Sequence, residues 1–107
     1  YDIKRTQAGN LVVIGLRGHV FRSLENGSPW QASDSHVTAL LSSIVLSDDQ
    51  RVFILGNNGV LLESRDDGVS FTKHLQKDGK ALIAGVWYKN KIIAVSDVGI
   101  KTINITK

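Results

Sequence analysis

The sequence predicts an all-β domain made of about three four-stranded antiparallel sheets, and three observations lead to this prediction. Short runs rich in Val, Ile, Leu and aromatic residues alternate with clusters of Gly, Asn, Asp and Ser, which is typical of strands joined by tight turns. A longer motif recurs at an offset of 41 residues. Each copy contains a hairpin signal, clearest at Asn58-Gly59, because a type I′ turn requires a positive φ at both central positions.

The apolar runs place the strands along the chain. The runs predicted as strands are residues 11–16, 19–23, 30–33, 39–46, 52–55, 60–64, 71–75, 82–88, 92–95 and 100–105. Val37, Leu40 and Leu41 also follow helical spacing, but we interpret residues 37–46 as a strand because the repeat requires one there. Residues 1–6 fall opposite residues 42–47, so the chain is expected to begin partway along a first strand.

The repeat defines the internal organisation. Residues 14–30 superpose on residues 55–71 without a gap, and six pairs coincide: Gly15 with Gly56, Gly18 with Gly59, Ser23 with Ser64, Glu25 with Asp66, Gly27 with Gly68, and Trp30 with Phe71. A third copy begins at Ile92, reaches Gly99 and stops at Asn104, which falls opposite Ser64. The sequence therefore predicts one domain, 1–107, with repeats 1–35, 36–75 and 76–107, the last without its fourth strand.

The turns differ between the copies. Arg17-Gly18 and Val98-Gly99 occupy the place of Asn58-Gly59, but arginine and valine are less suited than asparagine to a positive φ. We expect both to use another short turn.

A second motif, Ser64-Arg-Asp66-Asp-Gly68-Val-Ser70-Phe71, forms a corner between two strands of the second copy. An acidic side chain two residues before glycine can accept hydrogen bonds from the amides of its own turn, while glycine supplies backbone freedom. The aromatic residue that follows is expected to point inward and bury a large apolar area. The first copy carries the same pattern at Ser23, Glu25, Gly27 and Trp30.

The corner motif resembles the Asp-box, or BNR repeat, and the whole repeat is most similar to the photosystem II stability/assembly-factor-like family. The first copy departs from the motif at Glu25 and Pro29. The resemblance implies four-stranded β-propeller blades, a non-catalytic assembly scaffold with a protein partner, and a periplasmic, lumenal or secreted location. The alternative is a fragment of a glycan-binding or sialidase-type glycosidase propeller, but no motif assigns its arginine triad or tyrosine nucleophile here.

Three blades do not close a ring, because propellers typically have 4–8 blades. An open stack leaves apolar faces and a strand edge in water. We therefore expect residues 100–105 to form an edge strand covered by a second copy of the chain, which would give six blades, or by the remainder of a longer chain. The absence of an initiator methionine and the start at Tyr1 suggest a processed chain or a piece of a longer one.

Composition excludes several classes of protein. The chain is 42% hydrophobic and 21% charged, which favours a globular domain over disorder. It has no cysteine, so disulfide scaffolds and thiolate chemistry are excluded. No apolar run reaches the roughly 18 residues of a membrane helix. The net charge of +3 does not indicate nucleic-acid binding.

The positive charge is concentrated in residues 1–22. These hold Lys4, Arg5, Arg17 and Arg22 against Asp2 alone, and they form either a partner-binding basic patch or a solvated face. Arg22 and Glu63 occupy equivalent positions in successive repeats, which suggests an ion pair between blades.

Nothing in the sequence predicts a catalytic residue, a cofactor or a metal ion. His19, His36 and His74 lack metal-ligand spacing, and Asp48-Asp49 is interpreted as a solvated loop. The segments Gly15-Leu-Arg-Gly18 and Gly56-Asn-Asn-Gly59 are read as hairpins, because no helix follows them to bind phosphate. Asn26-Gly-Ser28 and Asn104-Ile-Thr106 match the glycosylation sequon, a pattern that is common by chance.

Overall fold

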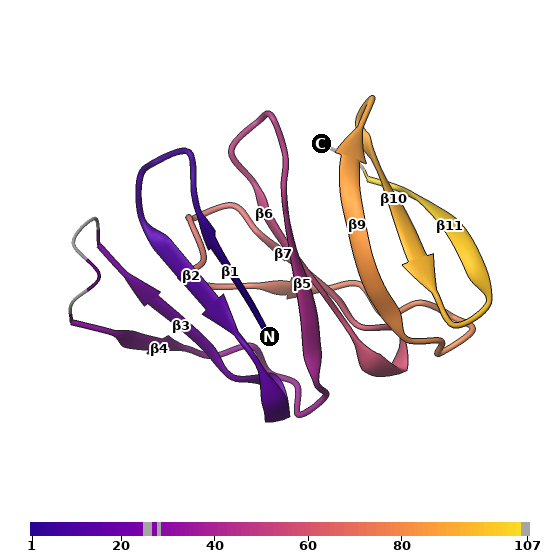
Figure 1. The fold of residues 1–107 in the computed structure, drawn as a ribbon, viewed down its shortest axis with the longest axis horizontal. Coiled ribbons are helices and arrows are strands. Elements are labelled where there is room, and N and C mark those ends of the chain that lie inside the picture. Colours follow the sequence, from indigo (N-terminus) through magenta and orange to yellow (C-terminus); the bar gives the residue numbers. More distant parts are fainter. Residues whose placement is uncertain (25–26, 28, 106–107) are drawn as a thin grey trace.

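A computed structural model describes residues 1–24, 27 and 29–105. Within these residues the chain forms three antiparallel sheets and two short 3-10 turns (Figure 1). The predicted all-β class is confirmed.

Each sheet is a meander, in which every strand pairs with the strand before it. Blade 1 contains β1 (Asp2–Arg5), β2 (Leu11–Ile14), β3 (Val20–Ser23) and β4 (Gln31–Ser33). Blade 2 contains β5 (Leu41–Leu46), β6 (Val52–Gly56), β7 (Leu61–Ser64) and β8 (Thr72–Lys73). Blade 3 contains β9 (Leu82–Tyr88), β10 (Lys91–Ser96) and β11 (Gly99–Asn104).

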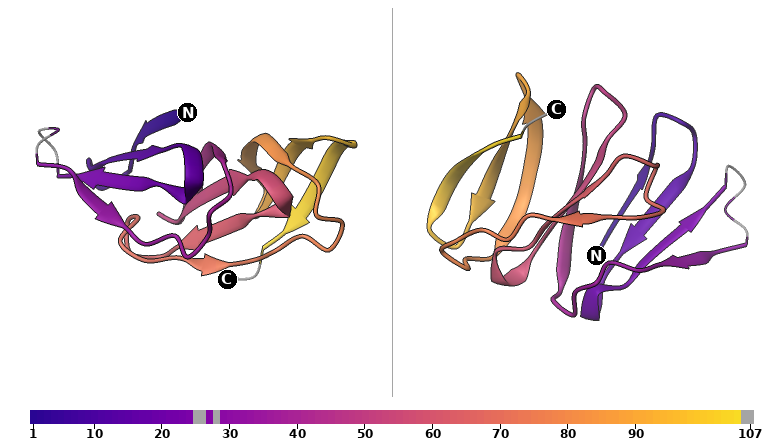
Figure 2. Two further views of the ribbon diagram at one scale, coloured as in Figure 1. Left: turned by 90° about the horizontal axis from the view of Figure 1, so that it is seen from below. Right: turned by 180° about the vertical axis from the view of Figure 1, so that it is seen from behind.

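The blades stand side by side and fan out from their first strands. In Figures 1 and 2 the three sheets follow one another along the long axis of the molecule, with β5 of blade 2 between blades 1 and 3. The strand β5 contacts both β1 and β9. Polar contacts join these first strands as well: Asp2 Oδ2 accepts the Ile44 amide at 2.9 Å, and Ser42 Oγ donates to Leu82 O at 2.6 Å.

The core consists of two apolar layers, one in each gap between blades. The layer between blades 1 and 2 contains Val12, Ile14, Val20, Leu41, Ile44, Val52, Ile54, Val60 and Leu62. The layer between blades 2 and 3 contains Val45, Phe53, Leu55, Leu61, Leu82, Ile92, Ala94 and Ile103. Blade 2 is therefore buried on both faces, because side chains alternate along a strand and each face of its sheet meets another sheet.

The hairpin turns correct one expectation. Asn58 and Gly59 have φ of 61° and 72°, and the Val60 amide donates to Asn57 O at 3.2 Å, as the type I′ prediction requires. Arg17 and Gly18 adopt the same turn, with φ of 56° and 71°, so the expectation of a different turn there is wrong. At Val98-Gly99 only the glycine has a positive φ, and this hairpin does use another turn.

Packing around the turn explains why Arg17 has a positive φ, a conformation that suits asparagine better. The tip of the blade 1 hairpin is fixed by a hydrogen bond from the Gly18 amide to Ala39 O at 2.8 Å. An ideal Cβ on Gly18 would lie 1.9 Å from Val37 O, so only glycine fits at this second turn position. The turn is thus selected by the segment packed against it.

That segment, residues 37–40, is not part of a strand as predicted, because β5 begins at Leu41. Its backbone groups bind hairpin tips of both neighbouring blades instead: Ala39 O accepts from Gly18, and Leu40 O accepts the Asn57 amide at 2.9 Å. The bond to Asn57 lies directly beyond the Leu41–Gly56 pair of β5 and β6, whereas the bond from Gly18 gives Ala39 O a partner in blade 1 in place of a neighbouring strand.

The third hairpin is one residue shorter, and this changes the register at the end of the chain. Val52 pairs with Ser64 in blade 2, whereas the equivalent Ile92 pairs with Ile103 in blade 3. The place of Ser64 is therefore taken by Ile103, and not by Asn104 as the sequence offset indicated.

A search of the described residues for a bilayer-spanning helix, judged by length and hydropathy, finds none.

Candidate functional site

The corner of blade 2, residues 64–71, is held by hydrogen bonds within itself. Ser64 Oγ donates to Asp66 Oδ1 at 2.8 Å and accepts the Gly68 amide at 2.8 Å. Asp66 Oδ1 accepts the Ser70 amide at 2.9 Å, and Asp66 Oδ2 accepts from Ser70 Oγ. Burial disfavours ionisation of Asp66, but these hydrogen bonds prevail and hold its pKa below its usual range.

The aromatic residues of the two corners lie in different surroundings. Phe71 packs against the core layer between blades 1 and 2. Trp30, its counterpart in blade 1, is 43% exposed, so the expectation that both point into a core is wrong for Trp30. The aromatic residue of a corner faces the preceding blade. Phe71 therefore packs against blade 1, whereas Trp30 belongs to the first blade of the described residues and has no such neighbour. Glu25, and the sequon residues Asn26, Ser28 and Thr106, lie outside the described residues.

This difference predicts unequal effects of two matched substitutions. Phe71→Ala is expected to lower the free energy of unfolding by about 2 kcal/mol, because it removes a large side chain packed on a core layer. Trp30→Ala is expected to cost less than about 1 kcal/mol, because its side chain is half exposed. Urea unfolding followed by far-ultraviolet circular dichroism measures both; equal losses would contradict the assignment of the two environments.

The corner of blade 2 also binds blade 1. Arg22 donates to Asp67 O and lies 3.4 Å from Asp67 Oδ2, and Asn10 Nδ2 donates to the same carboxylate. Ser33 Oγ donates to Gly68 O at 2.7 Å. The between-blade ion pair of Arg22 is therefore formed with Asp67, and the predicted pair with Glu63 is wrong. Arg22 and Glu63 face different gaps, because each occupies the same position on its own blade.

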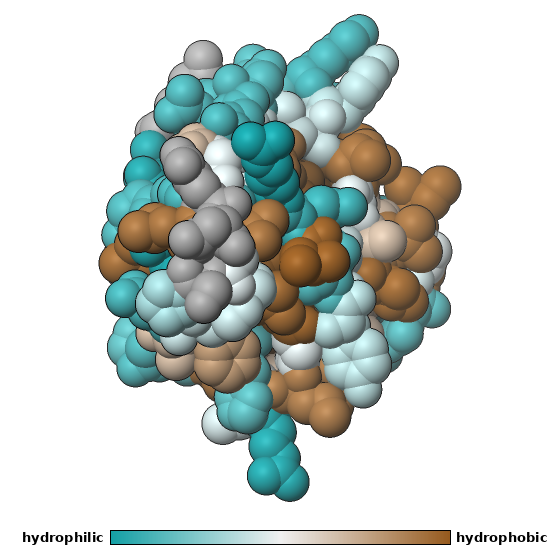
Figure 3. Space-filling view, turned by 60° about the vertical axis from the view of Figure 1, so that its left-hand side comes forward, coloured by the Kyte–Doolittle hydropathy of each residue, from teal (hydrophilic) through white to brown (hydrophobic). Residues whose placement is uncertain are grey.

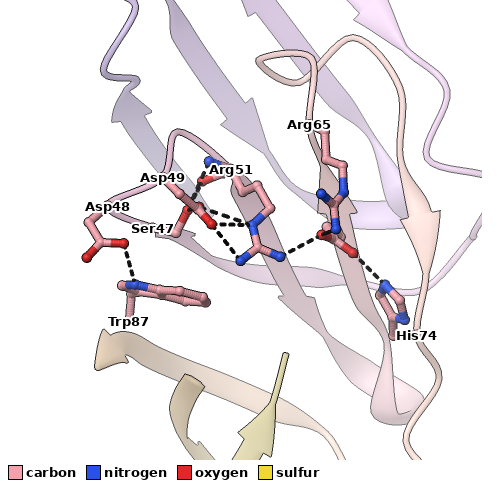
Figure 4. A network of polar contacts seen from close by, with 8 residues as sticks. Ser47, Asp48, Asp49, Arg51, Arg65, His74 and Trp87 are labelled. Carbon is pink, nitrogen blue, oxygen red and sulfur yellow. Dashed lines mark hydrogen bonds and ion pairs between the residues drawn. The ribbon is translucent and has the colours of Figure 1, made fainter. Parts of the chain in front are cut away.

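Glu63 belongs to a network between blades 2 and 3 (Figure 4). Its Oε2 accepts from Arg51 NH1 at 2.9 Å and lies 3.1 Å from Arg65 NH2, and its Oε1 lies 2.8 Å from His74 Nε2. Burial disfavours ionisation of Glu63, but its hydrogen bonds with Arg51 and His74 and the charge of Arg65 keep its pKa below its usual range.

Arg51 is the centre of this network and is buried. Its guanidinium lies 2.7 Å from Asp49 Oδ2 and 5.2 Å from the ring centroids of both Phe53 and Trp87, which stack on each other. Asp48 Oδ1 accepts from Trp87 Nε1 at 2.9 Å. Both residues are exposed, as the interpretation of Asp48-Asp49 as a solvated loop requires, but their carboxylates also have partners: Asp48 binds Trp87 of blade 3, and Asp49 binds Arg51 of its own blade.

Asp49 carries a shifted pKa. The hydrogen bond from Arg51 lowers its pKa to about 2. Because the folded pKa is depressed, this carboxylate contributes stability above the unfolded value near 3.8, and the contribution is lost as the pH falls toward 2.

We expect Asp49→Asn to destabilise the chain at pH 7 by about 1 kcal/mol or less, because the carboxylate is more than a third exposed and solvent screens it. The variant is also expected to have a flatter pH dependence of stability between pH 4 and 2. Thermal unfolding from pH 2 to 7 measures both. A parallel downward shift at every pH would show that the loss does not come from the ionised carboxylate.

The structure does not gather the predicted basic patch. Lys4 and Arg5 are exposed on β1, where Lys4 pairs with Val12 and Arg5 with Leu11. Arg17 is exposed at the hairpin that follows the other end of β2, and Arg22 is engaged with Asp67. Lys4 and Arg5 remain as exposed cations next to each other in the chain, on opposite faces of β1, because successive residues of a strand point to opposite sides of its sheet.

A groove begins at Thr6, the residue that follows Arg5 in the chain. It has a volume of about 470 Å³ and is lined by Thr6–Ala8, by the loop of Ser47 and Asp49–Arg51, and by Arg65–Asp67. These segments are the loops that follow β1, β5 and β7, so the groove collects one loop from blade 1 and two from blade 2. Within the described residues no three His, Asp or Glu side chains are close enough to hold a metal ion.

Comparison with solved structures identifies the architecture. The chain is similar to YCF48 from Cyanidioschyzon merolae with a TM-score of 0.79 and 22% sequence identity. The similarity covers 96% of this chain and 33% of that chain. The chain has the fold of a partial β-propeller. No family model matches the sequence. No curated protein matches it either.

As blades of a propeller, the end sheets present the faces that would meet further blades. The outward face of blade 3 carries Val86, Ile93, Val95 and Ile100, the last 81% exposed. The outward face of blade 1 carries Ile3, Val13 and Phe21. In Figure 3, which brings the blade 1 side forward, apolar surface lies among the hydrophilic side chains. Soluble domains avoid large exposed apolar faces unless they bind something.

Sequence reasoning missed the Arg51 network. The repeat offset contained a usable signal, since Arg51 falls opposite Asn10 and Glu63 opposite Arg22. Those two blade 1 residues bind the corner of the next blade, whereas their blade 2 counterparts bind each other.

Proposed function

We propose that the chain is a non-catalytic, protein-binding assembly scaffold of the photosystem II stability/assembly-factor-like kind, built from Asp-box blades. The observation that carries this proposal is that four acidic side chains of blade 2 bind other groups of the fold. Asp66 closes its own corner, Asp67 binds blade 1, and Asp49 and Glu63 bind Arg51. These carboxylates have partners within the fold, which supports a structural role for them over acid–base chemistry.

The partner contact is assigned to Lys4, Arg5 and the groove beside them. Both cations are exposed, and neither has an ion-pair partner among the described residues. An acidic, extended segment of a partner protein is expected to run along the edge strand β1, where its carboxylates can reach both cations, beside a groove that is lined by carboxylates as well as by arginines. Arg17 and Arg22 are left out of this contact.

An acidic probe tests this assignment with a matched control. A fluorescein-labelled hexaglutamate peptide is expected to bind the chain, and the double variant Lys4→Glu/Arg5→Glu is expected to bind it at least five-fold more weakly, by fluorescence anisotropy at low salt. Arg17→Glu serves as the control, since it reverses a charge at the other end of the blade. Equal weakening by Arg17→Glu would show that only net charge matters.

The absence of catalysis is tested on the same preparation. The alternative glycosidase propeller would hydrolyse a fluorogenic sialoside, and a scaffold would not. Turnover that follows the protein through purification would overturn the proposed function.

We further propose that additional blades complete the propeller, supplied by a second copy or by the remainder of a longer chain. The chain spans about a third of the YCF48 chain that it matches, and its end blades have exposed apolar faces. Sedimentation velocity over a hundred-fold concentration range separates the two sources. A dimer supports the second copy, whereas a monomer throughout favours further blades from the same chain.

A further inference from the structure

The hairpin tip of blade 2 is held between two other segments of the chain. It is a 3-10 turn, η2 (Asn57–Gly59), in which Asn58 is exposed and Gly59 is buried. The Asn57 amide donates to Leu40 O at 2.9 Å, and Gly59 O accepts the Gln76 amide at 2.8 Å. The tip is therefore anchored both to the segment before β5 and to the segment after β8.

The dipeptide Asn58-Gly59 is chemically reactive when its backbone is free to rotate. The glycine nitrogen can then attack the side-chain carbonyl carbon of the asparagine, because glycine has no side chain to hinder the approach. The new C–N bond closes a five-membered succinimide ring, and the side-chain nitrogen takes up the glycine amide proton and leaves as ammonia. Water opens the ring at either of its two carbonyl groups. The product is aspartate or isoaspartate, and isoaspartate has an additional carbon in the backbone.

The folded turn prevents the ring from closing. Asn58 has a φ of 61° and a ψ of 27°. At this ψ the Gly59 nitrogen nearly eclipses the backbone nitrogen of Asn58, so it is turned away from Asn58 Cβ, which the ring must include. Ring closure requires a rotation about this bond, and the rotation breaks the hydrogen bonds that anchor the tip. The contacts of the tip therefore control the reaction.

We propose that Asn58 is a site of spontaneous deamidation that reacts only when the hairpin tip of blade 2 opens. Local openings of a folded protein require less free energy than global unfolding. A reaction of the open form follows the population of that form when opening and closing are faster than the reaction. Deamidation at Asn58 thus accumulates with time and records how often the tip leaves its packed position.

Among the described residues, two other pairs have an acidic residue before glycine, namely Asp67-Gly68 and Asp78-Gly79. Both carboxylates lie in ion pairs, at 3.4 and 3.0 Å. An ionised carboxylate is a much poorer target for a nucleophile than an amide, so these pairs are not sites of the same reaction. The pair Asn26-Gly27 includes a residue outside the described part of the chain, and its reaction is measured separately.

The two products are expected to have different effects. Aspartate tolerates a positive φ as asparagine does, so Asn58→Asp, which copies the first product, is expected to fold with a melting temperature within about 3 °C of the unmodified chain. Isoaspartate lengthens the backbone between the anchored Asn57 amide and Gly59 O. The turn cannot keep both hydrogen bonds, and this product is expected to melt at a lower temperature than the aspartate product.

Peptide mass spectrometry tests the site on the intact chain. The chain is kept in mildly alkaline buffer, either folded or in guanidinium chloride, and conversion of the peptide that contains Asn58 is followed over time. Deamidation is expected at least about ten-fold more slowly in the folded chain. Equal rates in the two states, or no deamidation in guanidinium chloride, would overturn the proposal.

Gly56→Ala is expected to open the tip selectively. Its new Cβ would lie 2.7 Å from Leu40 O, the acceptor of the Asn57 amide, although a φ of −155° suits alanine. The folded variant is expected to deamidate at Asn58 at least about three-fold faster than the unmodified chain. Gly15→Ala is the matched control one repeat earlier, because its Cβ would meet no atom nearer than 3.7 Å.

Phe71→Ala separates local opening from global unfolding. It weakens the core layer between blades 1 and 2 but leaves the contacts of the blade 2 tip in place, so the rate at Asn58 is expected to stay unchanged. Circular dichroism checks that each variant is folded. If Gly56→Ala is unfolded, the Phe71→Ala rate and the comparison of folded with denatured chain decide. Equal acceleration by both variants, or no acceleration by folded Gly56→Ala, contradicts control by the tip.

Discussion

Replacing Gly18 with alanine is expected to lower the free energy of unfolding by about 2–5 kcal/mol. Two costs add at this position. The residue has a φ of 71°, a region that costs a residue with a Cβ about 1–2 kcal/mol. The new methyl group would also lie 1.9 Å from Val37 O, and displacing packed backbone costs about 1–3 kcal/mol more. Chemical denaturation at pH 7 measures the loss.

Gly79→Ala is the matched control for this substitution. Gly79 has a φ of 63°, but an added Cβ would meet no atom within 4 Å. Gly79→Ala is therefore expected to show only the conformational cost, about 1–2 kcal/mol. If the two variants lose equal stability, the contact between the hairpin tip and residues 37–40 does not stabilise the fold.

Arg51→Ala is expected to cost about 3–5 kcal/mol, because it leaves Glu63 buried without its principal cation. It also removes the guanidinium from the rings of Phe53 and Trp87. For a domain of this size the melting temperature should fall by roughly 12–25 °C. Differential scanning calorimetry measures this change, and the exposure of Trp87 should appear as a red shift of its fluorescence.

Arg65→Ala is the control for Arg51→Ala, because it removes a cation that also contacts Glu63 but lies at the surface. Arg65 contacts the same oxygen of Glu63, but its side chain is 59% exposed whereas that of Arg51 is 4% exposed. A loss of less than about 1 kcal/mol is expected. Similar losses for the two arginines would mean that Glu63 needs any nearby cation and that the buried position of Arg51 has no special importance.

Much of the local structure could be predicted because it depends on neighbours in the chain. The Asn58-Gly59 turn follows from the tolerance of both residues for a positive φ, and Asp66 accepts the amide of Ser70, four residues away. The bounds of β9, and those of β6 to within one residue, follow from apolar runs that end in turn residues, whereas β2 ends at Ile14, two residues before the predicted end. The 41-residue offset then supplied the blade as a unit.

The errors have a common origin in contacts between blades. Residues 37–40 are not part of β5, and Ala39 O binds the hairpin tip of blade 1 at Gly18. Trp30 remains exposed and Phe71 does not, although they occupy the same place in the repeat. Arg22 and Glu63 were paired in the prediction because equivalent positions look like partners, whereas equivalent positions on successive blades face different gaps.

The sequence by itself determined the class of fold, the blade as a repeating unit and the chemistry of each turn, because these depend on periodicity and on interactions within a few residues. Only the tertiary structure decided which side chains meet across the gaps, and hence that Asp67 binds Arg22, that Arg51 joins Asp49 to Glu63, and that β11 has an open edge. These partners are distant in sequence, and which of two like residues is buried depends on whether another blade lies against it.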